Sequence, residues 1–150
     1  MKLSTLNVMS GLVLAVVAQA AVLRVGPGSQ YTNICSAIDA AKTGDTVEID
    51  AAGRYDGDVC RIGTSNLTLR GVGNGRAHIR SNGRVSEGKA IWVIGPQTNN
   101  TVIENMEFSG ARVLDKNGAG IRVDAGAVNL TIRNCHFHDN EDGILAGDSR

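Results

Sequence analysis

This chain repeats one short segment three times, as NLTLRGV (residues 66–72), NTVIENMEF (100–108) and NLTIRNCHF (129–137). When the segments are aligned on their first asparagine, apolar residues fall in shared columns, at offsets of 34 and 29 residues. Apolar and polar residues alternate with a period of two, which is typical of short β-strands with one buried face. Self-similarity at this spacing indicates structural repeats that stack on one another.

One column of this alignment contains Gly71, Asn105 and Asn134. Glycine and asparagine are the residues that best tolerate a left-handed backbone conformation. We therefore expect a sharp bend at this column in every repeat, with Asn105 and Asn134 lying one above the other. Such a stack of bent strands is a parallel β-helix.

A second repeat supports the first. Its copies are GKAIWVIG (88–95), GAGIRVD (118–124) and DGILAG (142–147), and GDVCRIG (57–63) fits the same frame. The alignment puts one apolar residue of each copy in a shared column: Cys60, Ile91, Ile121 and Ile144. Each coil therefore contains a G-x-x-I strand, an asparagine-led strand, a bend and a third short strand. Repeats of this kind gain their core by stacking.

The composition fits this architecture and excludes one class of partner. The 150 residues include 19 glycines, and aromatic residues make up only 3%. This balance suits short strands with many tight bends. Fifteen basic and fifteen acidic residues cancel, so the net charge gives no indication of binding to nucleic acid or to an anionic membrane.

The first twenty residues have the features of a signal peptide. A basic residue, Lys2, is followed by an apolar run (11–18) and by Ala18-Gln19-Ala20, the A-x-A pattern of a cleavage site. The run is too short to span a bilayer as a stable helix. We expect cleavage after Ala20 and a secreted or periplasmic protein, with an uncleaved N-terminal anchor as the alternative.

The mature chain is expected to begin with a cap. The helical spacing i, i+3, i+4, i+7 is met by Ile34, Ala37, Ile38 and Ala41, with Asn33 able to cap the start. A helix at this position would cover the open end of the coil stack. The predicted organisation is therefore a signal peptide (1–20), an N-terminal cap with a helix and a first strand (21–56), and β-helix coils (57–150).

Export makes the cysteines interpretable, because disulfides persist in oxidising compartments. Cys35 lies in the expected cap helix and Cys60 in the first coil, so a bridge between them would tie the cap to the stack. Cys135 is then left unpaired, as a small buried side chain. No matching cap is visible after residue 147. We therefore expect the N-terminal part of a longer protein or a truncated gene product, with a short chain that dimerises through its open end as the alternative.

Two stretches resemble a known family. The run YTNICSAIDAAKTGDTVEIDAAGRYDGDV (31–59) resembles the opening segment of secreted bacterial right-handed parallel β-helix proteins with the pectin-lyase-like fold. The run NLTIRNCHFHDNEDGI (129–144) resembles a coil of the same superfamily. The resemblance implies an all-β protein, a right-handed parallel β-helix solenoid with a short N-terminal capping helix. Because the matching residues are those of the scaffold, the resemblance is specific for the fold and not for an activity.

Members of that superfamily mostly act on polysaccharides as lyases, hydrolases or epimerases, and others are adhesins or periplasmic helpers of metalloenzyme assembly. We therefore expect an extracellular polysaccharide partner, to be bound or processed by the full-length protein. The alternative is a non-catalytic surface or adhesion scaffold. A uronate lyase needs a cation to neutralise the substrate carboxylate and a base to remove a proton. No matched set of such groups is apparent, so we expect this chain alone to show no cleaving activity.

The candidate substrate-facing residues lie on the expected outer face of the G-x-x-I strands, whose outward column is Arg61, Trp92, Arg122 and Leu145. Trp92, flanked by the cations Lys89 and Arg122, could offer an aromatic face to a sugar ring. The alternative is an ordinary solvated strand face with a half-buried tryptophan. The long turn 109–118 could form one wall of a groove, and its Lys116 is a candidate base.

A second candidate site lies in the turn after the third asparagine-led strand. The carboxylates of Asp139, Glu141 and Asp142 could hold Ca²⁺, which prefers oxygen ligands. The alternative is an acidic turn that is simply solvated. No Ser-His-Asp pattern or zinc-ligand spacing occurs, and the three histidines share no catalytic frame. His78 is expected to be a surface strand residue.

Overall fold

The structure is a computed structural model that describes residues 19–147, so the expected signal peptide lies almost entirely outside the described residues. The described part contains one helix, α1 (Ile34–Ala40), and thirteen short strands. The strands are β1 (Val22–Val25), β2 (Thr46–Asp50), β3 (Tyr55–Asp56), β4 (Cys60–Ile62), β5 (Thr68–Val72), β6 (Ala77–Arg80), β7 (Ala90–Ile94), β8 (Val102–Glu104), β9 (Met106–Ser109), β10 (Ala119–Val123), β11 (Thr131–Arg133), β12 (His136–His138) and β13 (Asp142–Ala146). Within residues 19–147, no helix is long and apolar enough to cross a membrane.

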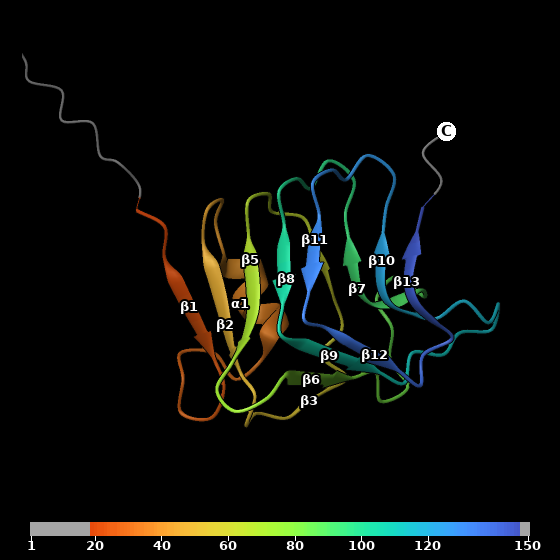
Figure 1. Ribbon diagram of the computed structural model, residues 1–150, viewed down its shortest axis with the longest axis horizontal. Helices are drawn as coiled ribbons and strands as arrows, with labels where there is room; N and C mark the ends of the chain where they lie inside the picture. Colours follow the sequence, from red (N-terminus) through yellow and green to blue (C-terminus); the bar gives the residue numbers. More distant parts are fainter. Residues whose placement is uncertain (1–18, 148–150) are drawn as a thin grey trace, which may run out of the picture.

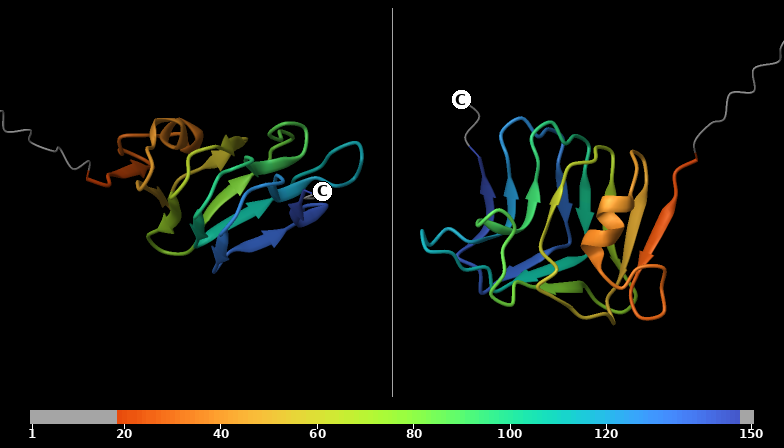
Figure 2. Two further views of the ribbon diagram at one scale, coloured as in Figure 1. Left: turned by 90° about the horizontal axis from the view of Figure 1, so that it is seen from above. Right: turned by 180° about the vertical axis from the view of Figure 1, so that it is seen from behind.

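The strands form three parallel sheets, which we call A, B and C. Sheet A has the order β1-β2-β5-β8-β11, sheet B the order β12-β9-β6-β3, and sheet C the order β13-β10-β7-β4. From β4 onward the chain visits sheets C, A and B in turn, so each circuit adds one strand to each sheet (Figures 1 and 2). This mostly-β arrangement of stacked parallel sheets is compatible with a parallel β-helix.

The first repeat stacks in the predicted register. Leu69 of β5 pairs with Ile103 of β8, and Ile103 pairs with Ile132 of β11. The inward side chains of Leu69 and Ile103 are fully buried, as the period-two pattern predicts.

The second repeat is shifted by one residue from the predicted alignment. Trp92 of β7, and not Ile91, pairs with Cys60 on one side and with Ile121 on the other. Ile121 pairs with Ile144, as predicted. Ile91 and Trp92 both belong to the buried core although they are consecutive, so strict alternation fails in β7. The predicted alignment of β7, which assumed strict alternation, is therefore wrong by one residue.

The bend column is confirmed at its two asparagines. Asn105 and Asn134 have φ of 57° and 51°, and Asn134 Nδ2 donates a hydrogen bond to Asn105 Oδ1 at 2.9 Å. Asn105 Nδ2 donates in turn to the carbonyl oxygen of Gly71 at 2.8 Å. Gly71 itself is not in the left-handed region, and β5 continues through it. A Cβ at Gly71 would overlap the carbonyl oxygen of Asn105 and lie 2.9 Å from the backbone nitrogen of Ala77. Glycine is therefore needed there for close approach and not for a bend.

A second asparagine ladder lies at the opposite end of the same strands. Asn66, Asn100 and Asn129 all have φ between 55° and 58°. Asn100 Nδ2 donates to Asn66 Oδ1 at 2.9 Å, and Asn129 Nδ2 donates to Asn100 Oδ1 at 3.0 Å. Side-chain ladders of this kind hold successive coils in register, because each amide bonds to its equivalent in the next coil.

The interior of the stack holds a row of aromatic rings. The fully buried Trp92 meets Phe108 edge-on, with ring centroids 5.1 Å apart. Phe108 stacks on Phe137 of the next coil at 5.2 Å. The core therefore runs along the stack and crosses from sheet C to sheet B.

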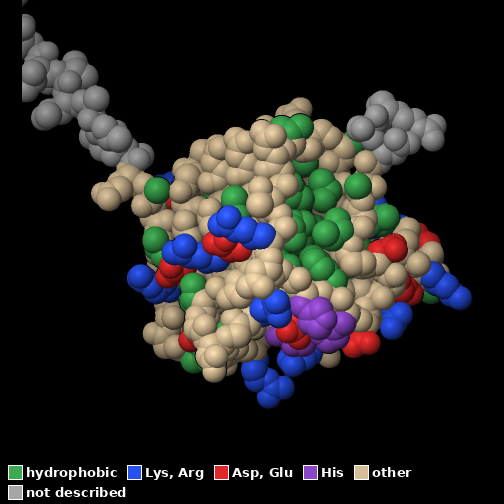
Figure 3. Space-filling model, in the orientation of Figure 1, with side chains coloured by type: hydrophobic (Ala, Val, Ile, Leu, Met, Phe, Trp, Pro, Cys, Tyr) green, Lys and Arg blue, Asp and Glu red, His purple; other side chains and the backbone are tan. Residues whose placement is uncertain are grey.

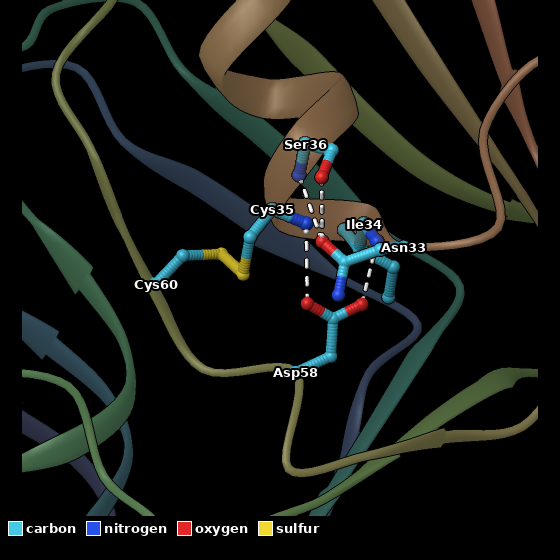
Figure 4. Close-up of a disulfide and its surroundings, with 6 residues drawn as sticks. All are labelled: Asn33, Ile34, Cys35, Ser36, Asp58 and Cys60. Carbon is cyan, nitrogen blue, oxygen red and sulfur yellow. Dashed lines mark hydrogen bonds between the residues drawn. A yellow bond between two sulfur atoms is a disulfide. The ribbon is translucent and has the colours of Figure 1, made fainter.

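The N-terminal end of the stack is closed by α1, which packs on β1, β2 and β4 (Figure 2). Asn33 caps the helix as predicted, since its Oδ1 accepts the N–H of Ser36 at 2.9 Å. The buried carboxylate of Asp58 accepts the N–H groups of Ile34 at 2.5 Å and Cys35 at 3.2 Å (Figure 4). These bonds satisfy donors that a helix start would otherwise leave unpaired.

The chain preceding β1 is held by Asp45, whose buried carboxylate joins two segments. Its Oδ1 accepts the backbone N–H of Ala21 at 2.7 Å, and its Oδ2 accepts that of Lys42 at 2.8 Å. These two hydrogen bonds, chiefly the one from Ala21, lower the pKa of Asp45 below its ordinary value. The carboxylate is thus favoured in its charged form.

The predicted disulfide is confirmed. Cys35 of α1 and Cys60 of β4 are bonded, with Cα atoms 5.6 Å apart, so the cap is covalently joined to the first coil (Figure 4). Cys135 is free and partly buried in the described part of the chain, and burial raises the pKa of its thiol. That environment is the one expected of a packed side chain and not of a nucleophile.

Removing this bridge should lower stability markedly. The double variant Cys35→Ala, Cys60→Ala is expected to lose about 3 kcal/mol of unfolding free energy, because the unfolded chain regains the freedom of the loop. Denaturant titration followed by circular dichroism measures this loss. The control variant Cys135→Ala keeps the bridge, so a reductant should still lower its free energy of unfolding. A change below about 1 kcal/mol in the double variant would contradict the expectation.

Candidate functional site

The outer face of sheet C carries most of the predicted substrate-facing column. Val93 of β7 pairs with Arg61 of β4 on one side and with Arg122 of β10 on the other. Arg122 pairs in turn with Leu145 of β13. Arg61, Arg122 and Leu145 therefore lie in one column, as the sequence indicated. The fourth position is occupied by Val93 and not by Trp92.

The predicted role of Trp92 as a sugar platform is wrong. Its side chain is fully buried and packs against Phe108 in the core. The one-residue shift of β7 turns Trp92 inward and puts Val93 in the outer cluster with Ala90 and Ala119. No ring face of Trp92 is left for a ligand.

The cations on this face are held by carboxylates. Arg61 Nη1 lies 2.6 Å from Glu87 Oε1 and 3.3 Å from Asp124 Oδ2, and Arg122 Nε lies 3.0 Å from Asp124 Oδ1. Glu87 has a positive φ of 51°, which is uncommon for a residue other than glycine or asparagine. The result is a network in which two arginines and two carboxylates balance each other.

A groove of about 540 Å³ lies beside this network. It is bordered by two loops, residues 81–89 before β7 and 110–118 before β10. Its lining consists of Val85, Gly88, Arg112, Val113, Leu114 and Asp115. Lys89 forms an ion pair with Asp115 and so joins the two loops. The long turn thus lines a groove, as predicted, whereas Lys116 is not one of the lining residues.

The long loop is fixed at its base by the turn that was considered for Ca²⁺. Glu141 Oε2 accepts the N–H groups of Val113 at 2.9 Å and Gly118 at 2.8 Å, and these bonds lower the pKa of Glu141. Asp139 instead bonds to His138. Among residues 19–147, the carboxylates of Asp139, Glu141 and Asp142 do not converge into a ligand set. Glu141 therefore shapes the groove.

The structure brings together all three histidines of the chain, which the sequence had left unrelated. In sheet B, Glu107 of β9 pairs with His78 of β6 on one side and with His136 of β12 on the other. His138 lies two residues after His136 in β12. Glu107 Oε1 lies 3.1 Å from both His78 Nδ1 and His138 Nε2, and Glu107 Oε2 lies 4.0 Å from His136 Nδ1. The histidine side chains form one surface patch (Figure 3). This proximity was not predicted from the sequence.

The sequence does contain a signal for this cluster. Aligning the third strand of each coil, AHIR (77–80), MEFS (106–109) and HFH (136–138), places His78, Glu107 and His136 in one column. The alignment of the asparagine-led segments already places Glu107 over His136, but its first copy ends at Val72 and does not reach His78. His78 is a strand residue at the surface, as expected, and it also belongs to this cluster.

The histidines and Glu107 influence one another electrostatically. Hydrogen bonds to Asp139 and then to Glu107 raise the pKa of His138. Burial lowers the pKa of His78. Burial opposes ionisation of Glu107, but the hydrogen bond from His138 and the charges of the histidines leave its pKa lowered overall. Glu107 is therefore a carboxylate among imidazoles of differing proton affinity.

Comparison with protein-family models found no matching family, and comparisons with curated proteins and with solved structures found no similar protein. What the chain can bind is therefore argued from its own two surface features, the groove beside sheet C and the histidine cluster on sheet B.

Proposed function

We propose that this protein is an exported right-handed parallel β-helix with the pectin-lyase-like fold, and that it binds an extracellular polysaccharide in the groove beside sheet C. The stacked parallel sheets, the cap helix and the disulfide support this fold and an oxidising compartment. The signal peptide would comprise residues 1–20, with cleavage after Ala20.

The groove between the two loops is the observation that carries this proposal. Sugar rings present apolar C–H faces edged by hydroxyl groups. The groove offers the matching surfaces, since Val85, Val113 and Leu114 are apolar while Arg112 and Asp115 supply donors and acceptors. The ion pair between Lys89 and Asp115 and the Glu141 hydrogen bonds hold its walls in place. A preformed groove reduces the entropy lost on binding.

The pairing of the cations favours binding over cleavage. A lyase needs one cation free to neutralise a substrate carboxylate and a base poised to take a proton. In the described part of the chain, Lys89 is paired with Asp115, Arg122 with Asp124, and Arg61 with Glu87 and Asp124. Arg112 of the groove lining is in no ion pair among the described residues, but the carboxylate beside it in that lining, Asp115, is bound by Lys89 and is not poised as a base. These ion-paired side chains can form hydrogen bonds with the hydroxyl groups of a sugar. We therefore expect no unsaturated uronates when the chain is incubated with pectate or alginate.

The groove is tested by titrating the chain with pectate, alginate and neutral glucans in a calorimeter. The variant Arg112→Ala, Leu114→Ser should bind the recognised polysaccharide at least about 10-fold more weakly, which corresponds to about 1.4 kcal/mol. Leu114 is fully exposed, so its replacement should leave the fold intact. The matched control is Arg54→Ala, an exposed cation that does not line the groove. Unchanged affinity in the groove variant, or no binding by the wild type, would favour a non-catalytic surface scaffold.

A further inference from the structure

The outer face of sheet B carries an assembled set of metal-ligand atoms, at a different place from the groove. The Nδ1 or Nε2 atoms of His78 and His138 and a carboxylate oxygen of Glu107 all lie within 4.8 Å of one another. We propose that His78, Glu107 and His138 bind one divalent transition-metal ion, with Zn²⁺ as the representative ion. This site is independent of the proposed polysaccharide groove.

Two separations within the set are close to those of a zinc site. Zinc bonds to histidine nitrogen and carboxylate oxygen measure about 2.0–2.1 Å, so ligand atoms around a tetrahedral ion lie about 3.3 Å apart. The two separations of His78 Nδ1 and His138 Nε2 from Glu107 Oε1 are each 3.1 Å. Small side-chain rotations would therefore admit the ion. Two histidines and one glutamate form a ligand set that zinc uses when one coordination position stays open.

The far nitrogens of both histidines are also occupied, and this is a feature of metal ligands. His78 Nε2 hydrogen-bonds to Ser109 Oγ at 2.7 Å, and His138 Nδ1 hydrogen-bonds to Asp139 Oδ2 at 2.8 Å. Such outer partners fix the ring orientation and the tautomer, so that the other nitrogen is directed at the ion. The other nitrogen of each ring, His78 Nδ1 and His138 Nε2, faces Glu107.

The position of the cluster suits an ion arriving from solution. The side chains of His78, Glu107 and His138 are 19%, 24% and 34% exposed, so they are partly desolvated but reachable. His136 is the nearest further donor, with Nδ1 at 4.0 Å from Glu107 Oε2, and its ring stacks on His138. The rigid strands β6, β9 and β12 carry all four residues, which favours precise ligand placement.

The donor atoms also select the class of ion. Imidazole nitrogens with one carboxylate suit Zn²⁺, Co²⁺, Ni²⁺ and Cu²⁺, whereas Ca²⁺ and Mg²⁺ prefer oxygen ligands throughout. The cluster should therefore discriminate against the alkaline-earth ions. This distinguishes it from the calcium site that the acidic turn had suggested.

The proposal is tested by calorimetric titration of the metal-free, disulfide-bonded chain with ZnCl₂ at pH 7.5. We expect one Zn²⁺ per chain with a dissociation constant below about 1 µM. His78→Ala, His138→Ala and Glu107→Gln should each weaken binding more than about 100-fold, and Asp139→Asn about 10- to 100-fold. CoCl₂ should give the visible absorption of a tetrahedral ion. CaCl₂ should give no heat of binding.

Three controls keep the outcome clear. The variant Cys135→Ser removes the free thiol and should bind Zn²⁺ like the wild type. His136→Ala should weaken binding less than the three core variants, because its nitrogen is farther from Glu107 Oε1. Circular dichroism of every variant without metal should match the wild type, so that lost binding is not lost folding. If the double variant His78→Ala, His138→Ala still binds Zn²⁺ with wild-type affinity, or if the wild type binds none, the cluster is only a hydrogen-bonded ladder and the proposal fails.

Discussion

Replacing Trp92 with alanine should lower the free energy of unfolding by about 3–5 kcal/mol, the range for truncating a buried aromatic side chain. The side chain is fully buried, meets Phe108 edge-on and lies in the row of rings that continues to Phe137. Truncation would open a cavity that short, hydrogen-bonded strands cannot close. Urea unfolding followed by far-ultraviolet circular dichroism measures the loss.

Two further variants make this result specific. Trp92→Phe should cost less than about 2 kcal/mol, because a ring is kept and the indole N–H has no hydrogen-bond partner within the described residues. Leu114→Ala truncates a fully exposed apolar side chain and should change stability by no more than about 0.5 kcal/mol. If Trp92→Ala behaves like Leu114→Ala, then Trp92 lies on the surface and the pairing of β7 with β4 and β10 has a different register.

Replacing Gly71 with alanine should be comparably damaging, at more than about 3 kcal/mol, although only one methyl group is added. The new Cβ would overlap the backbone carbonyl of Asn105 in the next coil and lie 2.9 Å from the nitrogen of Ala77. Both neighbours are backbone atoms, so neither can rotate away. Relief would require the separation of β5 from β8 and would disturb the hydrogen bond from Asn105 Nδ2 to the Gly71 carbonyl.

Gly63→Ala is the matched control for this change. Gly63 has an ordinary φ, and a Cβ there would meet no atom within 4 Å. The substitution should be neutral or slightly stabilising, because alanine restricts the unfolded chain. Equal unfolding midpoints for the two variants in thermal denaturation would refute the close packing of Gly71 against the next coil.

The asparagine-led strands could be predicted from the sequence because their information is local. Each has one buried face, so alternation fixes its register, and β8 and β11 end before an asparagine with a left-handed backbone. Asn105 and Asn134 stack as expected for this reason. Gly71 is in the same column for a different reason, since a side chain there would collide with the backbone of the next coil. The sequence alone does not show how close that backbone lies.

The candidate site was harder to predict because it depends on contacts between coils. Ile91 and Trp92 are both buried, which breaks the alternation on which the choice of outward residues rested. His78 and Glu107 are separated from His138 by whole coils, and only the stacking of β6, β9 and β12 brings them together. Ligands contributed by successive coils are separated by about one coil period and not by the short spacing that usually marks a metal site, so only an alignment of the third strands relates them.

The hydrogen bond from Ala21 to Asp45 has a consequence for maturation. In the full chain the donor is a peptide N–H, 2.7 Å from a buried carboxylate. Cleavage after Ala20, as proposed, would convert that donor into an α-ammonium group, and Asp45 would become its counterion. The bond to the carboxylate is charge-assisted already in the full chain, and an ammonium donor would add the attraction between two opposite charges. If the leader is removed as proposed, the attachment of β1 to the stack would become stronger at the moment of cleavage.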